Sequence, residues 1–319
     1  MGLLKMVRAT ALILISAPIF SCQMHQKPIV SKSVVKTAKD KLQYALENSA
    51  QWEKVHAAEY ILNLDYSNNV HDIFVEEEKQ NRNEPYYRIG IWRVLNQAAT
   101  ATEEKKRWLD SISSVFEKYT SLDRVHAAES LAKLKVSPNT ISFKVTDSIL
   151  KSAHNPLWGY TYWGTAYTSE ADMPKVKNKF MDIILKSDEP TSIKRIALYA
   201  LYKMKDISVQ NWDLLISRTL KEATNSPLYT SLLTCTLANT PADSLLSSRV
   251  LQCREMLNKQ LYSLKNNELA AALAVYQDIA TEEDLPFLIS YMEKGIDEEN
   301  TEITMAAANA ILGLDSEGR

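Results

Sequence analysis

The chain has 319 residues, with 37 Lys and Arg residues against 39 Asp and Glu residues, and a formal net charge of −2 at pH 7. This balance gives no basic field for nucleic acid, so we expect no nucleic-acid partner. Only seven glycines occur in the whole chain, which disfavours turn-rich β architectures and glycine-rich phosphate loops.

The N-terminal 21 residues have the pattern of a secretory signal peptide. A basic stretch precedes an apolar run at residues 9–20, which is too short for a membrane-spanning helix. The ending IFSC at residues 19–22 resembles a bacterial lipobox, although Phe20 departs from the usual small or polar residue there. A plain secretory signal with an incidental cysteine is the alternative.

The lipobox resemblance implies acylation of Cys22, with residues 22–35 as a flexible tether and residues 36–319 as the folded part. Gln23 in the second mature position resembles a signal for sorting to the outer membrane. We therefore predict an exported protein that is anchored in the lipid bilayer, on either the periplasmic or the surface face of that membrane.

A helix signature then recurs at a spacing of roughly 32 to 40 residues, as expected for stacked helix pairs. In chain order, the signature occurs in residues 55–64, 84–95, 125–134, 155–172, 194–204, 229–237, 268–276 and 304–312. More charged amphipathic stretches, typical of a solvated outer layer, stand between these helices at residues 69–79, 103–119, 176–186, 211–221 and 285–294.

Each signature has a reference position that is followed two places later by a small residue. The reference positions are His56, Arg88, His126, Gly159, Arg195, Tyr229, Leu269 and Met305. The small residues are Ala58, Gly90, Ala128, Thr161, Ala197, Ser231, Ala271 and Ala307. Small side chains allow neighbouring helix axes to approach closely, so we expect these positions to be packed.

This pattern resembles the HEAT family of α-solenoids across nearly all of the mature chain. The resemblance implies an all-α fold, a right-handed α-solenoid of about eight HEAT-like helix pairs, with the signature helices along its concave side. It implies little about function, because HEAT arrays serve as scaffolds, cargo binders and enzyme accessories.

The candidate binding residues share one helical face, which the reference position forms with the positions three, four and seven residues beyond it. In the last three units this face is mostly apolar, which is typical of packing, a capping surface or a protein dock. In the first five units it is polar and aromatic. We predict ligand-binding residues at His56, Glu59, Arg88, Trp92, His126, Glu129, Tyr162, Trp163, Arg195 and Tyr199.

The pairs His56/Glu59 and His126/Glu129 repeat a spacing of i and i+3. Two histidines and two carboxylates can ligate a metal or divide acid and base work, but the same residues also make structural hydrogen bonds between repeats. The chain contains no nucleophile elbow, phosphate loop, HExxH pair or zinc-type cysteine cluster. We therefore predict no metal, no cofactor and no assigned catalytic residue.

Two aromatic segments leave alternatives open. Residues 84–95 place arginines beside aromatic rings, which fits an anionic, ring-bearing ligand or an aromatic core helix with surface arginines. Residues 155–172 are either a platform for sugar stacking or an aromatic layer that replaces aliphatic packing.

Cys235 and Cys253 either form a disulfide or remain buried thiols.

We predict a membrane-anchored binding or scaffold module whose concave groove takes a protein or a glycan partner. The alternative is a carbohydrate-active enzyme of the glycosidase or lyase type that uses a cluster of His, Glu, Arg and Tyr residues on the same face. Convergence of His56, Arg88, His126, Tyr162 and Arg195 on one closed pocket would favour catalysis, whereas their spread along an open groove would favour binding.

Overall fold

A computed structural model describes residues 30–65, 69–186, 188–297 and 300–315. These residues form helices and no strand, which confirms the prediction of an all-α chain. None of the helices within these ranges has the length and apolar character needed to cross a membrane. The predicted signal peptide and Cys22 lie outside the described residues.

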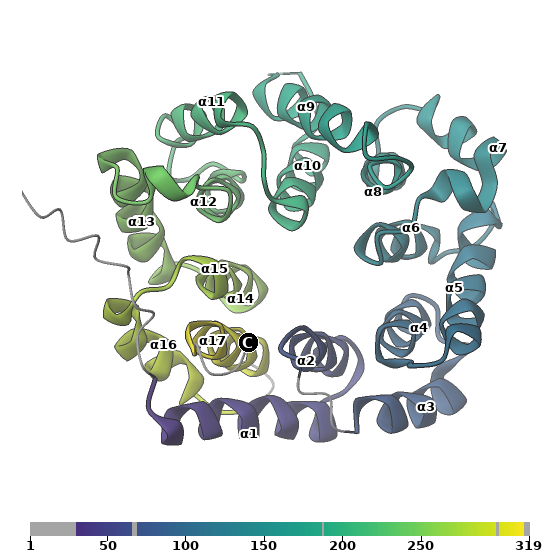
Figure 1. Cartoon of the computed structure of the whole chain (residues 1–319), viewed down its shortest axis with the longest axis horizontal. Helices are drawn as coiled ribbons and strands as arrows, with labels where there is room; N and C mark the ends of the chain where they lie inside the picture. The colour runs from purple at the N-terminus through teal and green to yellow at the C-terminus, as the bar shows by residue number, and fades with distance from the viewer. Residues whose placement is uncertain (1–29, 66–68, 187, 298–299, 316–319) are drawn as a thin grey trace, which may run out of the picture.

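The helices alternate between the outer and the inner layer of a ring (Figure 1). The outer layer contains α1 (Lys32–Asn48), α3 (Val70–Asn81), α5 (Thr102–Glu117), α7 (Pro138–Leu150), α9 (Asp172–Leu185), α11 (Val209–Thr219), α13 (Ser248–Leu261) and α16 (Leu285–Met292). The inner layer contains α2 (Gln51–Asn63), α4 (Tyr87–Ala98), α6 (Arg124–Lys133), α8 (Pro156–Thr165), α10 (Thr191–Met204), α12 (Tyr229–Ala238), α14 (Asn266–Ala274), α15 (Tyr276–Ile279) and α17 (Thr301–Leu314). Short 3₁₀ turns occur at Ala242–Ser244 and Glu282–Asp284.

The two ends of the array meet and close the ring. Helix α17 packs against α1 and also contacts α2, so the last inner helix is a neighbour of the first (Figure 1). Every residue of α17 from Ile303 to Leu314 is buried, because α1, α2, α14, α15 and α16 surround it. A helix that is apolar on all sides needs such surroundings. The concave face that was expected to form a groove therefore surrounds the centre of a ring.

The helical array begins before the boundary expected at residue 36. Helix α1 starts at Lys32, because the Ser31 hydroxyl accepts a hydrogen bond from the Val34 N–H at 3.4 Å. Val34 and Val35 also pack against the core. The last residues of the predicted tether thus form the first turn of α1.

Most of the small signature positions are packed between helices. Six are buried, namely Ala58, Gly90, Ala128, Thr161, Ala197 and Ala307. At Gly90, a β-carbon would stand 3.0 Å from side-chain atoms of Trp52 and Val55, so a larger residue would need these side chains to shift by a few tenths of an ångström. Ser231 and Ala271 are not buried, and the residues that follow them, Leu232 and Ala272, are. In these two units the packed position is shifted by one residue.

The aromatic segment around α8 provides packing. Trp158 and Trp163 are buried, with 4% and 1% of their surfaces exposed. Trp158 stacks on Tyr162 at 5.0 Å between ring centroids, and the ring of Trp163 meets that of Tyr199 edge-on at 5.8 Å. The rings of Trp158 and Trp163 thus fill the layer that aliphatic side chains fill in other units.

Both cysteines within the described ranges are buried free thiols. Burial raises the pKa of Cys235 to about 12 and that of Cys253 to about 11. Neither thiol is therefore a reactive thiolate at neutral pH.

Candidate functional site

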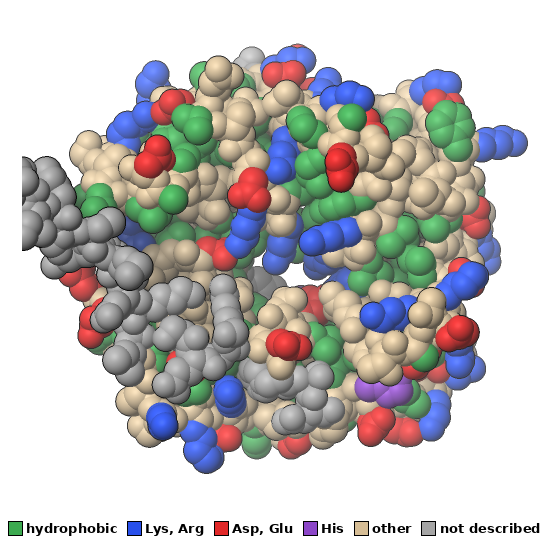
Figure 2. All heavy atoms as spheres, viewed as in Figure 1, with side chains coloured by type: hydrophobic (Ala, Val, Ile, Leu, Met, Phe, Trp, Pro, Cys, Tyr) green, Lys and Arg blue, Asp and Glu red, His purple; other side chains and the backbone are tan. Residues whose placement is uncertain are grey.

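The ring encloses a central cavity of about 640 Å³. Figure 2 shows this hollow, with Lys and Arg side chains around it on the face in view. Its lining comes from the inner helices and consists of Trp52, Glu53, His56, Glu59, Tyr60, Asn63, Lys133, Arg195, Leu198, Tyr199, Tyr202, Lys203, Ser231, Thr234, Ala270, Ala271, Ala274, Gln277, Glu302 and Asn309. This volume is in the range of cavities that hold small ligands.

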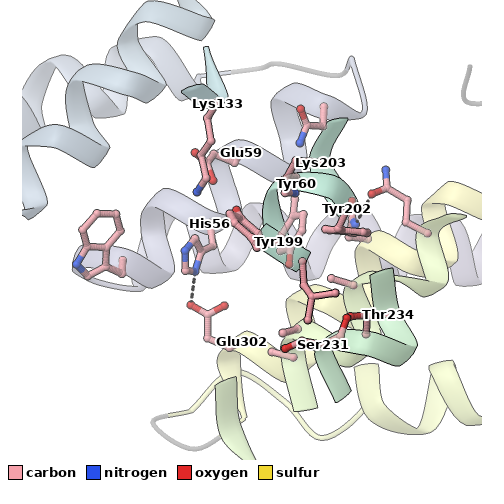
Figure 3. A pocket seen from close by; sticks show the side chains of 18 of the residues that line it. His56, Glu59, Tyr60, Lys133, Tyr199, Tyr202, Lys203, Ser231, Thr234 and Glu302 are labelled. Atoms are coloured by element: carbon pink, nitrogen blue, oxygen red, sulfur yellow. Dashed lines mark hydrogen bonds and ion pairs between the residues drawn. The ribbon is translucent and has the colours of Figure 1, made fainter. Parts of the chain in front are cut away.

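A histidine and a carboxylate meet where the ring closes. His56 on α2 and Glu302 on α17 approach to 2.7 Å between Nδ1 and Oε1 (Figure 3). An ionised carboxylate only accepts hydrogen bonds, so the contact places a hydrogen on Nδ1 of the imidazole. In the neutral ring, Nε2 is then an acceptor, and it has no hydrogen-bond partner among the residues that the structure describes. The pair can therefore take up a proton from a bound ligand or return one.

A second group of charges forms the wall beside this pair. Arg93 is fully buried and donates from Nε to Glu59 at 2.5 Å and from one terminal nitrogen to the Ser130 hydroxyl at 2.8 Å. Lys133 pairs with Glu129 at 3.1 Å. Two cations thus balance two carboxylates, which is the condition for keeping charges in a wall of low polarity.

The pKa values of this wall reflect the pairing. Burial alone would raise the pKa of Glu59, but the charges of Arg93, Lys133 and His56 lower it to about 2. Burial and the charge of Arg93 act to lower the pKa of Lys133, yet the nearby Glu129 and Glu59 raise it. Glu59 and Lys133 therefore stay charged across the ordinary pH range. They are better suited to stabilising a ligand's charge than to transferring a proton.

Three tyrosines from two helices face the cavity. Tyr60 on α2 lies across from Tyr199 and Tyr202 on α10 (Figure 3). Across the described ranges, none of their hydroxyls forms a hydrogen bond with the protein. Burial raises the pKa of Tyr60 and of Tyr202, so both phenols remain protonated donors. Three hydroxyls are consequently available to a ligand.

Lys203 joins the tyrosines at the cavity wall. Its Nζ lies 5.7 Å from the ring centroid of Tyr199 and 5.1 Å from that of Tyr202. No ion pair of Lys203 with a carboxylate occurs among the residues that the structure describes. Arg195, at the start of α10, likewise has no carboxylate partner there and donates to the Pro227 carbonyl at 3.0 and 2.8 Å. Lys203 and Arg195 therefore offer positive charge to an anionic group, in a cavity whose lining also contains the carboxylates of Glu53, Glu59 and Glu302.

Four of the ten residues predicted as a binding face line the cavity. These are His56, Glu59, Arg195 and Tyr199. The remaining six do not line the cavity and instead contact other protein side chains, namely Arg88, Trp92, His126, Glu129, Tyr162 and Trp163. The convergence of five residues was expected to distinguish catalysis from binding. His56 and Arg195 line the cavity, whereas Arg88, His126 and Tyr162 do not. This criterion therefore favours neither function.

Arg88 and Tyr162, away from the cavity, each contact a residue outside their own helix. Arg88 donates to both carboxylate oxygens of the buried Asp123, at 2.7 and 3.2 Å, and lies over the Trp92 ring at 5.4 Å. Tyr162 meets Phe180 of α9 edge-on at 5.5 Å and so lies against the outer layer. Within the described ranges, no three His, Cys, Asp or Glu residues are grouped to hold a metal ion.

Several lining residues were not predicted, although the helical period points to some of them. Trp52 stands one turn before His56, and Lys133 stands two turns after His126 on the same face. Glu302 stands one turn before the reference position of its own unit. Nothing local marks Gln277 or Asn309, whose side chains meet at 3.1 Å across the cavity wall.

Comparison with known proteins finds no relative of this chain. No family model, no curated protein sequence and no solved structure matches it. The function must therefore be argued from the cavity itself.

Proposed function

We propose that the protein is a binding module that holds the end of a glycan chain in its central cavity. One observation carries this proposal: the hydroxyls of Tyr60, Tyr199 and Tyr202 face one cavity without a hydrogen-bond partner in the described protein. A sugar has both the hydroxyls to pair with them and apolar C–H faces to lie on the rings. Lys203 adds a site for an acidic group on the sugar, such as the carboxylate of a uronic acid.

The closed ring favours a glycan end over a protein partner. A folded protein needs about 800 Å² of accessible surface on each side of a stable interface, which an enclosed cavity does not present. A protein partner would have to insert a terminus or a single side chain. In its general form, the proposal is that the cavity binds either a protein or a glycan partner.

Tyrosine-to-phenylalanine substitutions test the glycan site. Tyr202→Phe keeps the ring and removes only the hydroxyl, so binding of oligosaccharides by calorimetry should weaken by about threefold to tenfold, as expected for one net hydrogen bond. Tyr262→Phe is the matched control, because Tyr262 is 88% exposed and does not line the cavity. Equal affinity of the two variants would contradict the proposal.

The second candidate function is a carbohydrate-active enzyme. The His56–Glu302 pair favours it, because a carboxylate that orients an imidazole toward a cavity is a common arrangement for proton transfer. In that case His56→Gln should abolish the cleavage of a polysaccharide but leave binding of the intact chain within about threefold. Tight binding by the wild-type chain without any release of shorter products would leave the binding module as the function.

We also propose that the helix pairs are HEAT-like repeats in right-handed succession and that the chain is exported and lipid-anchored through Cys22. The repeated small positions and the lipobox-like residues 19–22 support these proposals. Cys22→Ser should move the protein from the membrane fraction to the soluble fraction after cell lysis. A mutant that stays with the membranes would show that Cys22 is not the anchor.

A further inference from the structure

An exposed tyrosine beside the cavity is held in an unusual backbone conformation. Tyr86, directly before α4, has φ 68° and ψ −59°, and the Tyr87 N–H donates to the Pro85 carbonyl at 2.9 Å. These values define a γ-turn of the rare positive-φ kind, which is strained for a bulky residue. Glycine would take this conformation without strain, so the tyrosine ring is retained at a conformational cost.

Tyr86 ends a row of rings that leads into the cavity. Its ring centroid is 5.0 Å from that of His126, which stacks on Trp52 at 5.6 Å with 30° between the planes. Trp52 lines the cavity, and its ring lies 6.3 Å from that of His56. Tyr86, His126 and Trp52, which we call the aromatic platform, therefore connect the surface with the His56–Glu302 pair.

All parts of the platform lie at the starts of inner helices. Trp52 is in the first turn of α2, Tyr86 precedes α4, and His126 is in the first turn of α6. Because each inner helix is followed by an outer helix that returns, the inner helices start at the same end of the ring. Glu302 also belongs to the first turn of its helix, α17, and Arg195 is the fifth residue of α10. The platform thus adjoins the mouth of the cavity.

The backbone of α4 makes room for the platform. A β-carbon at position 90 would stand 3.0 Å from Cζ3 of Trp52, so a larger residue would push this ring away from α4 by a few tenths of an ångström. Burial lowers the pKa of His126, which keeps the imidazole uncharged at neutral pH. Its Nδ1 is buried and has no hydrogen-bond partner among the described residues. The ring between the other two is therefore an uncharged plate.

Ordinary packing accounts for His126 and Trp52 but not for Tyr86. Its surface is 43% exposed, so the ring buries little apolar area in return for the strained turn. An aromatic ring held rigidly at the mouth of a cavity fits a ligand with flat apolar faces. The C–H faces of successive pyranose rings have this shape.

We propose that the aromatic platform is a second subsite, which binds the sugar rings that follow the unit held in the cavity. This inference rests on the proposed glycan function and adds that the ligand is an oligosaccharide that projects from the mouth across Trp52 toward Tyr86. Affinity then increases with chain length until Tyr86 is covered.

The test is a length series on the purified chain. Oligogalacturonides of two, four and six units, and neutral cello-oligosaccharides of the same lengths, are titrated by calorimetry into the wild type, Tyr86→Gly, Tyr86→Phe and Tyr262→Gly. Glycine removes the ring and relieves the positive φ, so Tyr86→Gly is expected to fold. Tyr86→Phe keeps the ring, and Tyr262→Gly removes an exposed ring that is not part of the cavity lining.

Tyr86→Gly should weaken binding of the six-unit ligand by about tenfold, the value of one aromatic contact, and leave binding of the two-unit ligand unchanged. Tyr86→Phe and Tyr262→Gly should bind both ligands like the wild type. Wild-type affinity that is independent of length, or an equal loss for short and long ligands, overturns the platform and leaves the cavity site in place. If none of these oligosaccharides binds the wild type, the glycan function fails and the platform fails with it.

Discussion

The buried ion pair between Glu59 and Arg93 allows the strongest quantitative prediction. The two side chains are 18% and 1% exposed, and they meet at 2.5 Å in the wall of the cavity. The substitution Glu59→Gln keeps the shape of the side chain and removes its charge. Arg93 is then left buried with only the Ser130 hydroxyl and an uncharged amide as acceptors.

The magnitude follows from the pKa of Glu59, which the folded chain lowers from 4.5 to about 2. A difference of about 2.5 pH units corresponds to about 3 kcal/mol of stability at pH 7. Because the folded-state pKa is the lower one, this contribution is complete above pH 5 and is lost as the pH falls toward 2. At pH 3 somewhat less than half of it remains.

Urea denaturation at pH 7 and at pH 3 measures this contribution. Glu59→Gln should lower the free energy of unfolding by about 3 kcal/mol at pH 7 and by about half as much at pH 3. Glu255→Gln is the control, since Glu255 pairs with Lys259 on the exposed surface of α13 and should not change the denaturation midpoint. A cost below about 1 kcal/mol at pH 7, or a cost that is equal at both pH values, would refute the reasoning.

Two further predictions concern packing. Gly313→Ala should lower the free energy of unfolding by about 1 to 3 kcal/mol in a chemical or thermal melt, because the added β-carbon would stand 2.8 Å from Cγ of Gln277 and 3.0 Å from its carbonyl oxygen; an unchanged melt would show that α17 can shift away from Gln277. The buried thiols of Cys235 and Cys253 should not react with a thiol reagent such as DTNB in the native chain and should both react after unfolding. Rapid labelling of the native protein would contradict their burial.

The helices and their two layers could be predicted from the sequence, because helix formation depends on local patterns. Apolar residues at a spacing of 3.6 identify the helices, and small residues identify the close contacts, as at Ala58 and Ala197. The same reasoning is less accurate where two apolar faces compete. In α12 and α14 the buried position is Leu232 or Ala272 and not the small residue before it, because both faces of these helices are apolar enough to pack.

The site could be predicted only in part. Helical periodicity placed His56, Glu59, Arg195 and Tyr199 on the inner surface, where they line the cavity. The same periodicity also placed Trp163 on the inner surface, but Trp163 is buried between helices and does not line the cavity. A helix turns its face toward the centre or toward a neighbour according to its rotation about its own axis, and packing partners outside the helix determine that rotation.

The sequence by itself determined the all-helical fold and the alternation of charged outer and small-residue inner helices, because these depend on residues within one or two turns of each other. Only the tertiary structure decided that the array closes. Closure brings α17 against α1 and α2, and it pairs Glu302 with His56 across 246 positions of sequence. Such a contact depends on the small rotation between successive helix pairs, summed around the ring, and no local pattern encodes that sum.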